Sequence, residues 1–427
     1  MNFLDEGRQA WKDSVRRWLD RDVGREYVRK CDMDRAFPYE AYEKAARLGF
    51  HRVLVPEADG GDGGDVFSYA LMCEALSAYG VDFSVAIAGG IFTAMNFSLH
   101  GTEDQKQRFL QPFMRGEVRF PISMSEPGAG SDVANVQTRA EAHGEHYVLN
   151  GQKLWCSGAA NRGAVILMLV RTAQTPDKRN GLSVFIVPND LPGLTIRPLQ
   201  TLARRSVVTT EIFLDNVRVP AANMLGAPGE GFKIIAGEHL ALERVAVAAS
   251  YVGNAQGAVD DALAYAKQRV QFGRPIFDFQ VIRHMLADMQ TQTDAARLLT
   301  YRAADLAARG LPCRKEVAMA KLFASETLQT VSRQAVQIFG GLGVKNVEVT
   351  EKNGPVVNIG QVHENEDLLV IDEASMVGIN LWHLIMDAAP SHMRIILIGD
   401  LNQLVPVADQ PMFPHALAAG LTHEHGW

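Results

Sequence analysis

The sequence predicts a multidomain α+β protein, with a helical N-terminal domain, a central β-barrel domain and a truncated C-terminal helical bundle. Three observations predict this order. Apolar residues recur at helical spacing up to about residue 120, short strand-like runs follow from 121 to 228, and helical spacing returns from 229 to 344. A length of 427 residues also favours two or three domains over one compact core.

The N-terminal domain, 1–120, is predicted to be helical from stretches such as 3–19 and 66–80, with the Gly-rich segment 58–65 as a loop between helices. In the middle domain, 121–228, an Asn-Gly turn at 150–151 separates two strand-like runs, and apolar runs such as AVILMLV follow. The C-terminal domain, 229–344, begins with an Ala- and Gly-rich helical stretch, which permits close helix approach.

The remaining residues, 345–427, differ from the preceding ones in composition and in the pattern of apolar residues. A polar, unpatterned stretch precedes LLVIDE at 368–373 and RIILIGD at 394–400, which are typical of buried strands. We expect an α/β fragment in which a helix separates these two strands.

Composition limits the functional classes. A net charge of -7 argues against nucleic acid as a partner, because phosphate binding needs a concentrated basic face. The N-terminus carries acids and no apolar signal region, and the apolar runs are too short to cross a bilayer, so we expect a cytoplasmic protein without a membrane partner. The four scattered cysteines predict reduced thiols, and no metal site is expected.

The segments PISMSEPGAGSD at 121–132 and HYVLNGQKLWCSG at 146–158 carry the most specific signal. Glycines and a proline force a turn that brings backbone N–H groups close to a bound group, and serine hydroxyls lie beside them. Trp155 offers a flat apolar face for a ring system. The alternative interpretation is a Gly-rich β-turn with a core tryptophan.

These two segments resemble the flavin-binding signature of the acyl-CoA dehydrogenase family. The resemblance implies FAD as cofactor, with Met124 and Ser125 at the flavin pyrimidine edge, Trp155 flanking the ring and Ser157 near N5. It places Ser131 toward the substrate thioester.

Further segments resemble the family in the same order. RVQFG at 269–273 and FQ at 279–280 imply that Arg269, Phe272 and Gln280 contact the FAD of a neighbouring subunit, and therefore a homo-oligomer, a dimer or a tetramer. An arginine suits a pyrophosphate because its planar fork matches the phosphate oxygens. QIFGGLG at 337–343 implies cofactor contacts at Gln337, Gly340 and Gly341.

The resemblance implies α,β-dehydrogenation of an acyl-CoA thioester, with an electron-transfer flavoprotein or a similar acceptor. Most relatives carry the catalytic base in an EGT segment near the C-terminus, which is absent here, and we expect the resemblance to end near Gly343. A minority carry it in a helix resembling LALERVAVAA, which makes Glu243 the candidate base and Arg244 a substrate contact. Glu243 could instead be an ordinary solvated or interfacial acid.

The C-terminal segments resemble motifs II and III of superfamily I helicases of the exonuclease V alpha-subunit kind. The resemblance implies that Asp372 holds Mg²⁺, Glu373 polarises the attacking water and Gln403 senses the γ-phosphate. The chain has no GxxxxGK[ST] loop to cradle phosphates, so we interpret this site as vestigial. A non-catalytic flavin-binding chimera and a helicase-related ATPase stay open as second and third functions.

Overall fold

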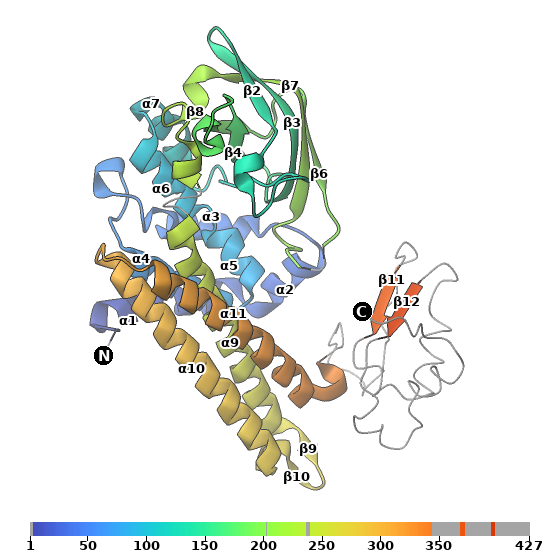
Figure 1. Cartoon of the computed structure of the whole chain (residues 1–427). Coiled ribbons are helices and arrows are strands. Elements are labelled where there is room, and N and C mark those ends of the chain that lie inside the picture. Colours follow the sequence, from blue (N-terminus) through green and yellow to red (C-terminus); the bar gives the residue numbers. More distant parts are fainter. Residues whose placement is uncertain (1–2, 202, 236–239, 344–367, 372–393, 398–427) are drawn as a thin grey trace. The chain divides into compact units, whose positions relative to one another are not determined.

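The computed structural model describes residues 3–201, 203–235, 240–343, 368–371 and 394–397. The chain divides into two compact units, Met1–Phe339 and Gly340–Trp427. The first unit carries a helical layer, a sheet and a set of long helices, in that order along the chain (Figure 1). The helical N-terminal part, the central sheet and the helical C-terminal part are therefore confirmed.

The N-terminal part consists of helices whose ends are fixed by local polar side chains. Asp5 accepts a hydrogen bond from the N–H of Arg8, and Asp65 from that of Ser68, so two helices begin with a side-chain cap. The longer helices are α1 Glu6–Trp18, α2 Arg25–Met33, α3 Tyr39–Arg47, α4 Val66–Ser77, α5 Val81–Ala88 and α6 Ile91–His100, and the short α7 Glu103–Gln105 and α8 Gln111–Met114 follow.

The segment Val81–His100 is apolar and long enough to cross a bilayer by composition alone. It consists of α5 and α6, which are separated by Gly89 and Gly90, and 61% of its most apolar window is buried inside the fold. We therefore interpret the two helices as core helices of the N-terminal part.

The central strands form one mixed sheet in the order β6-β7-β3-β2-β4-β5-β8, with β1 paired to β4 in parallel. In the described strands β6 and β8 end this ladder, so the domain expected as a barrel takes the form of a mixed sheet. The strands are β1 Ile122–Ser123, β2 Arg139–His143, β3 His146–Ser157, β4 Val165–Arg171, β5 Leu182–Pro188, β6 Leu194–Pro198, β7 Thr209–Pro220 and β8 Met224–Leu225.

Three long helices follow the sheet, α9 Leu240–Gln268, α10 Gln280–Ala308 and α11 Arg314–Phe339. A short hairpin of β9 Val270–Gln271 and β10 Arg274–Pro275 connects α9 to α10. Gly253 of α9 lies against α4, where a Cβ atom would come within 1.9 Å of the Glu74 carbonyl oxygen. Glycine is thus required for this close helix approach.

Buried charged side chains also connect the N-terminal helices α1 and α4 with α10. The Glu74 carboxylate on α4 is 2% exposed and accepts hydrogen bonds from Lys12 Nζ at 2.8 Å, Arg297 Nε at 2.9 Å and Tyr301 Oη at 2.7 Å. Burial alone would raise the pKa of Glu74, but Lys12 and Arg297 outweigh it and hold the pKa below its ordinary value. Three elements are joined at one carboxylate.

The second unit contains a parallel pair of strands, β11 Leu368–Ile371 and β12 Arg394–Leu397, which form their own two-stranded sheet. The two strands expected in this segment are present. The predicted intervening helix, and the candidate nucleotide-site residues Asp372, Glu373 and Gln403, lie outside the described residues.

Candidate active site

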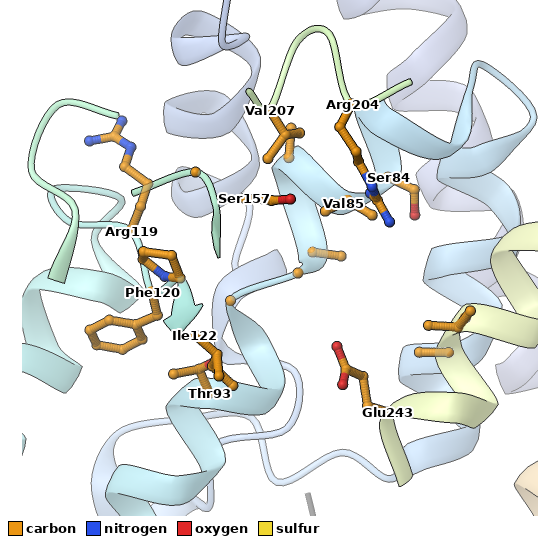
Figure 2. Close-up of a pocket in the computed structure, with 18 of the residues that line it drawn as sticks. Ser84, Val85, Thr93, Arg119, Phe120, Ile122, Ser157, Arg204, Val207 and Glu243 are labelled. Atoms are coloured by element: carbon orange, nitrogen blue, oxygen red, sulfur yellow. The ribbon is translucent and has the colours of Figure 1, made fainter. Parts of the chain in front are cut away.

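A cavity of about 300 Å³ lies where the N-terminal helices, the sheet and the start of α9 meet (Figure 2). Helices α5 and α6 form one wall, and the end of β3 forms another. The side chains that matter for its chemistry are Tyr69, Cys73, Ser84, Met124, Trp155, Ser157, Arg204, Glu243 and Ser250. Four of the residues selected from the sequence, Met124, Trp155, Ser157 and Glu243, are among them.

Glu243 lies in the first turn of α9, and its carboxylate points into the cavity (Figure 2). The side chain is half-buried. Burial raises the pKa of Glu243, and the positive charges of Arg204 and Arg244 oppose part of that rise. A carboxylate with a raised pKa is a stronger proton acceptor, so this position suits general base chemistry. Arg244 itself is exposed and does not line the cavity.

The Gly-rich segment begins at β1, which lies parallel to β4, and buried polar contacts fix its path. The backbone of Ser125 accepts a hydrogen bond from Leu154 at 2.9 Å, and the Met124 carbonyl accepts one from Lys153 Nζ at 2.9 Å. Lys153 Nζ also donates to the Glu126 carboxylate at 2.9 Å. Burial lowers the pKa of Lys153 to about 8, although Glu126 opposes the change. The turn predicted here is therefore anchored to β3.

Trp155 and Ser157 show why the end of β3 can receive a flat ring. The β3–β7 register shifts between Leu154 and Cys156, and Trp155 between them has a φ of 66°. The indole is 59% exposed in place of being packed in the core, and it borders the cavity. Ser157 presents a hydroxyl 3.0 Å from the hydroxyl of Thr209.

These features fit the isoalloxazine ring of FAD. An exposed indole gives the ring an apolar face to cover, and the Ser157 hydroxyl together with the backbone of Met124 and Ser125 offers polar partners for its edge. Gly128 and Gly130 have open space where a side chain would stand, so their backbone can approach a bound phosphate or ring.

Ser131 lies outside the Glu243 cavity. It is exposed and borders a separate depression whose other side chains include Asp132, Lys178, Arg179 and Phe232. Ser131 is therefore not among the residues that line the Glu243 cavity, and its contact with the thioester stays a prediction.

The later candidates are exposed and do not border the cavity of their own chain. Arg269, Phe272 and Gln280 belong to the β9–β10 hairpin and the start of α10, and the Phe272 side chain is 94% exposed. Gln337 is an exposed residue of α11. In the second unit Gly340 and Gly341 begin a short 3₁₀ turn, and Gly340 has a φ of 59°.

The sequence analysis missed several polar residues of the cavity wall, among them Tyr69, Ser84, Arg204 and Ser250. Ser84 and Ser250 resemble any small residue within an apolar helix, so their pattern predicts core packing. Arg204 belongs to a loop with no regular spacing, and an arginine there is typical of an exposed surface. Within the described residues, no group of three His, Cys, Asp or Glu side chains could hold a metal ion.

Comparison with known proteins gives consistent matches between residues 5 and 356. The chain matches the acyl-CoA dehydrogenase N-terminal domain at residues 5–117, the middle domain at 122–217 and the C-terminal domain at 229–356. The third match extends 13 residues past residue 343, where we expected the resemblance to end. A probable acyl-CoA dehydrogenase of Bacillus subtilis is 39% identical over 380 residues, which cover 87% of this chain and 98% of the relative.

Solved structures agree. Butyryl-CoA dehydrogenase from Megasphaera elsdenii has a TM-score of 0.75 and 34% identity, covering 80% of this chain and 90% of that one. A chain from a study of the electron transferring flavoprotein of Acidaminococcus fermentans has a TM-score of 0.76 and 35% identity, covering 81% and 90%. An FAD complex of PigA has a TM-score of 0.74 and 26% identity, covering 80% and 89%.

Proposed function

The chain belongs to the acyl-CoA dehydrogenase family, whose members use FAD to dehydrogenate acyl-CoA thioesters, and on this premise we propose that Glu243 is the catalytic base. The observation that carries the proposal is the position of its carboxylate. Glu243 points into the same cavity that Trp155 and Ser157 border, and burial raises its pKa. A base must lie within reach of the substrate α-carbon and hold a proton there.

FAD supplies the redox chemistry when it is bound, by accepting the β-hydrogen of the substrate as hydride at N5. We propose that Met124, Ser125, Trp155 and Ser157 hold its ring, as the exposed indole and the anchored turn support. Glu243 then removes the α-proton on the substrate side. Closure of the cavity by the bound groups excludes water, which strengthens the interaction of the carboxylate with the acidic α-hydrogen.

We further propose that Arg269, Phe272 and Gln280 contact the FAD of a neighbouring copy, so that the working form is a homo-oligomer. The support is their exposure on the β9–β10 hairpin and the start of α10, away from the cavity of their own chain. Gln337 in the first unit, and separately Gly340 and Gly341 in the second, are proposed as cofactor contacts from the sequence resemblance alone. Ser131 and the exposed Arg244 are proposed to contact parts of the thioester away from the reacting carbons.

The acyl-CoA is the substrate, and we propose an electron-transfer flavoprotein as the acceptor, which the likeness to a chain from the Acidaminococcus fermentans study supports. For the residues that follow the acyl-CoA dehydrogenase C-terminal domain match, 357–427, we propose a vestigial helicase-like fragment. Its support is the sequence of LLVIDE and RIILIGD and the parallel pairing of β11 with β12.

The test is anaerobic bleaching of the bound flavin by a series of saturated acyl-CoAs. Glu243→Gln should retain FAD, and its rate of flavin bleaching should fall on the order of 100- to 10,000-fold, because the isosteric amide cannot accept the α-proton. Asp260→Asn, an exposed acid on the same helix, is the matched control and should bleach at the parent rate. Equal rates in Glu243→Gln and parent would exclude the assignment. An FAD-loaded parent that no acyl-CoA bleaches would favour the non-catalytic alternative.

A further inference from the structure

The loop that carries Arg204 is held in a strained conformation beside the cavity. Arg204 has a φ of 63° and Val208 a φ of 44°, in the left-handed region that residues other than glycine rarely adopt. Such strain persists only where surrounding contacts impose it, and it concentrates at ligand sites. Here it accompanies an arginine that borders the same cavity as Glu243 (Figure 2).

Asp82 is the residue that holds this loop. Its carboxylate lies 3.6 Å from Nη1 of the Arg204 side chain, and burial raises its pKa although Arg204 and the backbone N–H groups of Arg205 and Arg204 oppose the rise. The charge of Arg204 is therefore already compensated by one carboxylate. Among the described residues, Nη1 is nevertheless buried and has no hydrogen-bond partner. A buried N–H donor without an acceptor is destabilising, and a bound oxygen would relieve it.

Further polar groups line the same cavity. Ser84 and Ser250 are among them (Figure 2 labels Ser84), and the Ser84 hydroxyl is 3.3 Å from the carbonyl oxygen of Cys73 and 3.3 Å from the hydroxyl of Ser250. Ser84 and Ser250 are almost completely buried. Hydroxyl groups both donate and accept hydrogen bonds, so these side chains can bind a ligand group that also does both.

The charges around Arg204 favour a neutral oxygen over a carboxylate oxygen as its partner on the substrate. Asp82 and Glu243 already place two carboxylates near the one guanidinium of Arg204, and Arg244 is exposed. A carboxylate on the substrate would add a third negative charge, while a neutral oxygen could accept a hydrogen bond from Nη1 without that repulsion.

We propose that Arg204, with Ser84 and Ser250, forms a subsite for a hydroxyl group on the acyl chain, so that the preferred substrates are hydroxylated acyl-CoA thioesters. The inference rests on the proposed function, because it places the acyl chain in the cavity that Glu243 faces. Dehydrogenation occurs at the α- and β-carbons, so the hydroxyl belongs farther along the chain.

The experiment measures binding by calorimetry on the FAD-loaded protein, in parallel with flavin bleaching. The ligands are hexanoyl-CoA, its analogue hydroxylated at the penultimate carbon, and adipyl-CoA, which carries a terminal carboxylate. The hydroxylated analogue should bind about 10- to 100-fold more tightly than hexanoyl-CoA, as expected for a hydrogen bond to a charged donor. Arg204→Met should abolish this ratio, and Arg204→Lys should restore part of it.

Arg205→Met is the matched control, since the Arg205 side chain pairs with Asp32 at 3.4 Å and does not border the cavity. It should leave the ratio at the parent value. Equal binding of the hydroxylated and plain chains, tightest binding of adipyl-CoA, or an equal loss in the Arg205 variant would each overturn the proposal. Bleaching by hexanoyl-CoA without hydroxyl preference would refute the subsite alone, whereas failure of every thioester to bleach the flavin would refute the proposed function.

Discussion

Replacement of Glu74 by glutamine should destabilise the first unit strongly. The carboxylate is 2% exposed and is the acceptor for Lys12, Arg297 and Tyr301, at distances between 2.7 and 2.9 Å. Glutamine keeps the shape but leaves the buried Lys12 without a counter-charge and removes one of the two acidic partners of the partly buried Arg297, which also pairs with Asp294. Breaking a buried ion pair on one side typically costs about 3–5 kcal/mol, because the remaining charge stays desolvated.

The assay is urea unfolding followed by tryptophan fluorescence. Asp261→Asn is the matched control, because the Arg25–Asp261 pair has the same 2.8 Å separation as the Lys12–Glu74 pair but is about half exposed, and its loss should change the unfolding free energy by roughly 0–1 kcal/mol. Since the folded pKa of Glu74 is depressed, its contribution should be present above the ordinary carboxyl pKa and be lost as the pH falls through the folded value. Equal effects of the two substitutions would refute the reasoning.

Three other outcomes follow from the described contacts. Gly253→Ala should lower the thermal midpoint by the equivalent of about 1–3 kcal/mol, because the new Cβ would overlap the Glu74 carbonyl; an unchanged midpoint would contradict this. Lys153→Met should weaken FAD binding about tenfold in a fluorescence titration, because Glu126 within the Gly-rich turn loses its cation, and an unaltered Kd would count against the role of that anchor. The dehydrogenation rate should fall as the pH drops through the raised pKa of Glu243, and a rate that is level down to the ordinary carboxyl pKa would disprove its titration as the base.

The arrangement of helices and strands could be predicted because it depends on local patterns. Apolar spacing predicts α4 and α9, and the fully buried run of β4 predicts a central strand. The shape of the sheet was harder to predict. Its ends at β6 and β8 depend on pairings between distant strands, and the shift that exposes Trp155 arises only where β3 meets β7.

The candidate site was predictable where a long motif specifies it. Met124, Trp155 and Ser157 were selected from such motifs and border one cavity with Glu243. Arg204 was not predictable, because its position depends on Asp82, which lies more than a hundred residues earlier. A contact of this kind leaves no periodic signal, and only the folded loop brings the two charges together.

The Glu74 cluster has a consequence for the order of events during synthesis on the ribosome. Arg297 follows Glu74 by 223 residues, and the apolar α4, α5 and α6 share one core with α9, α10 and α11. At about 5–20 residues per second, the partners of α4 are translated roughly 11–45 seconds after α4 itself. During this interval the apolar surface of α4, α5 and α6 is not yet covered, and Glu74 lacks Arg297. We therefore expect the nascent chain to depend on chaperones that bind exposed apolar helices until α10 has emerged.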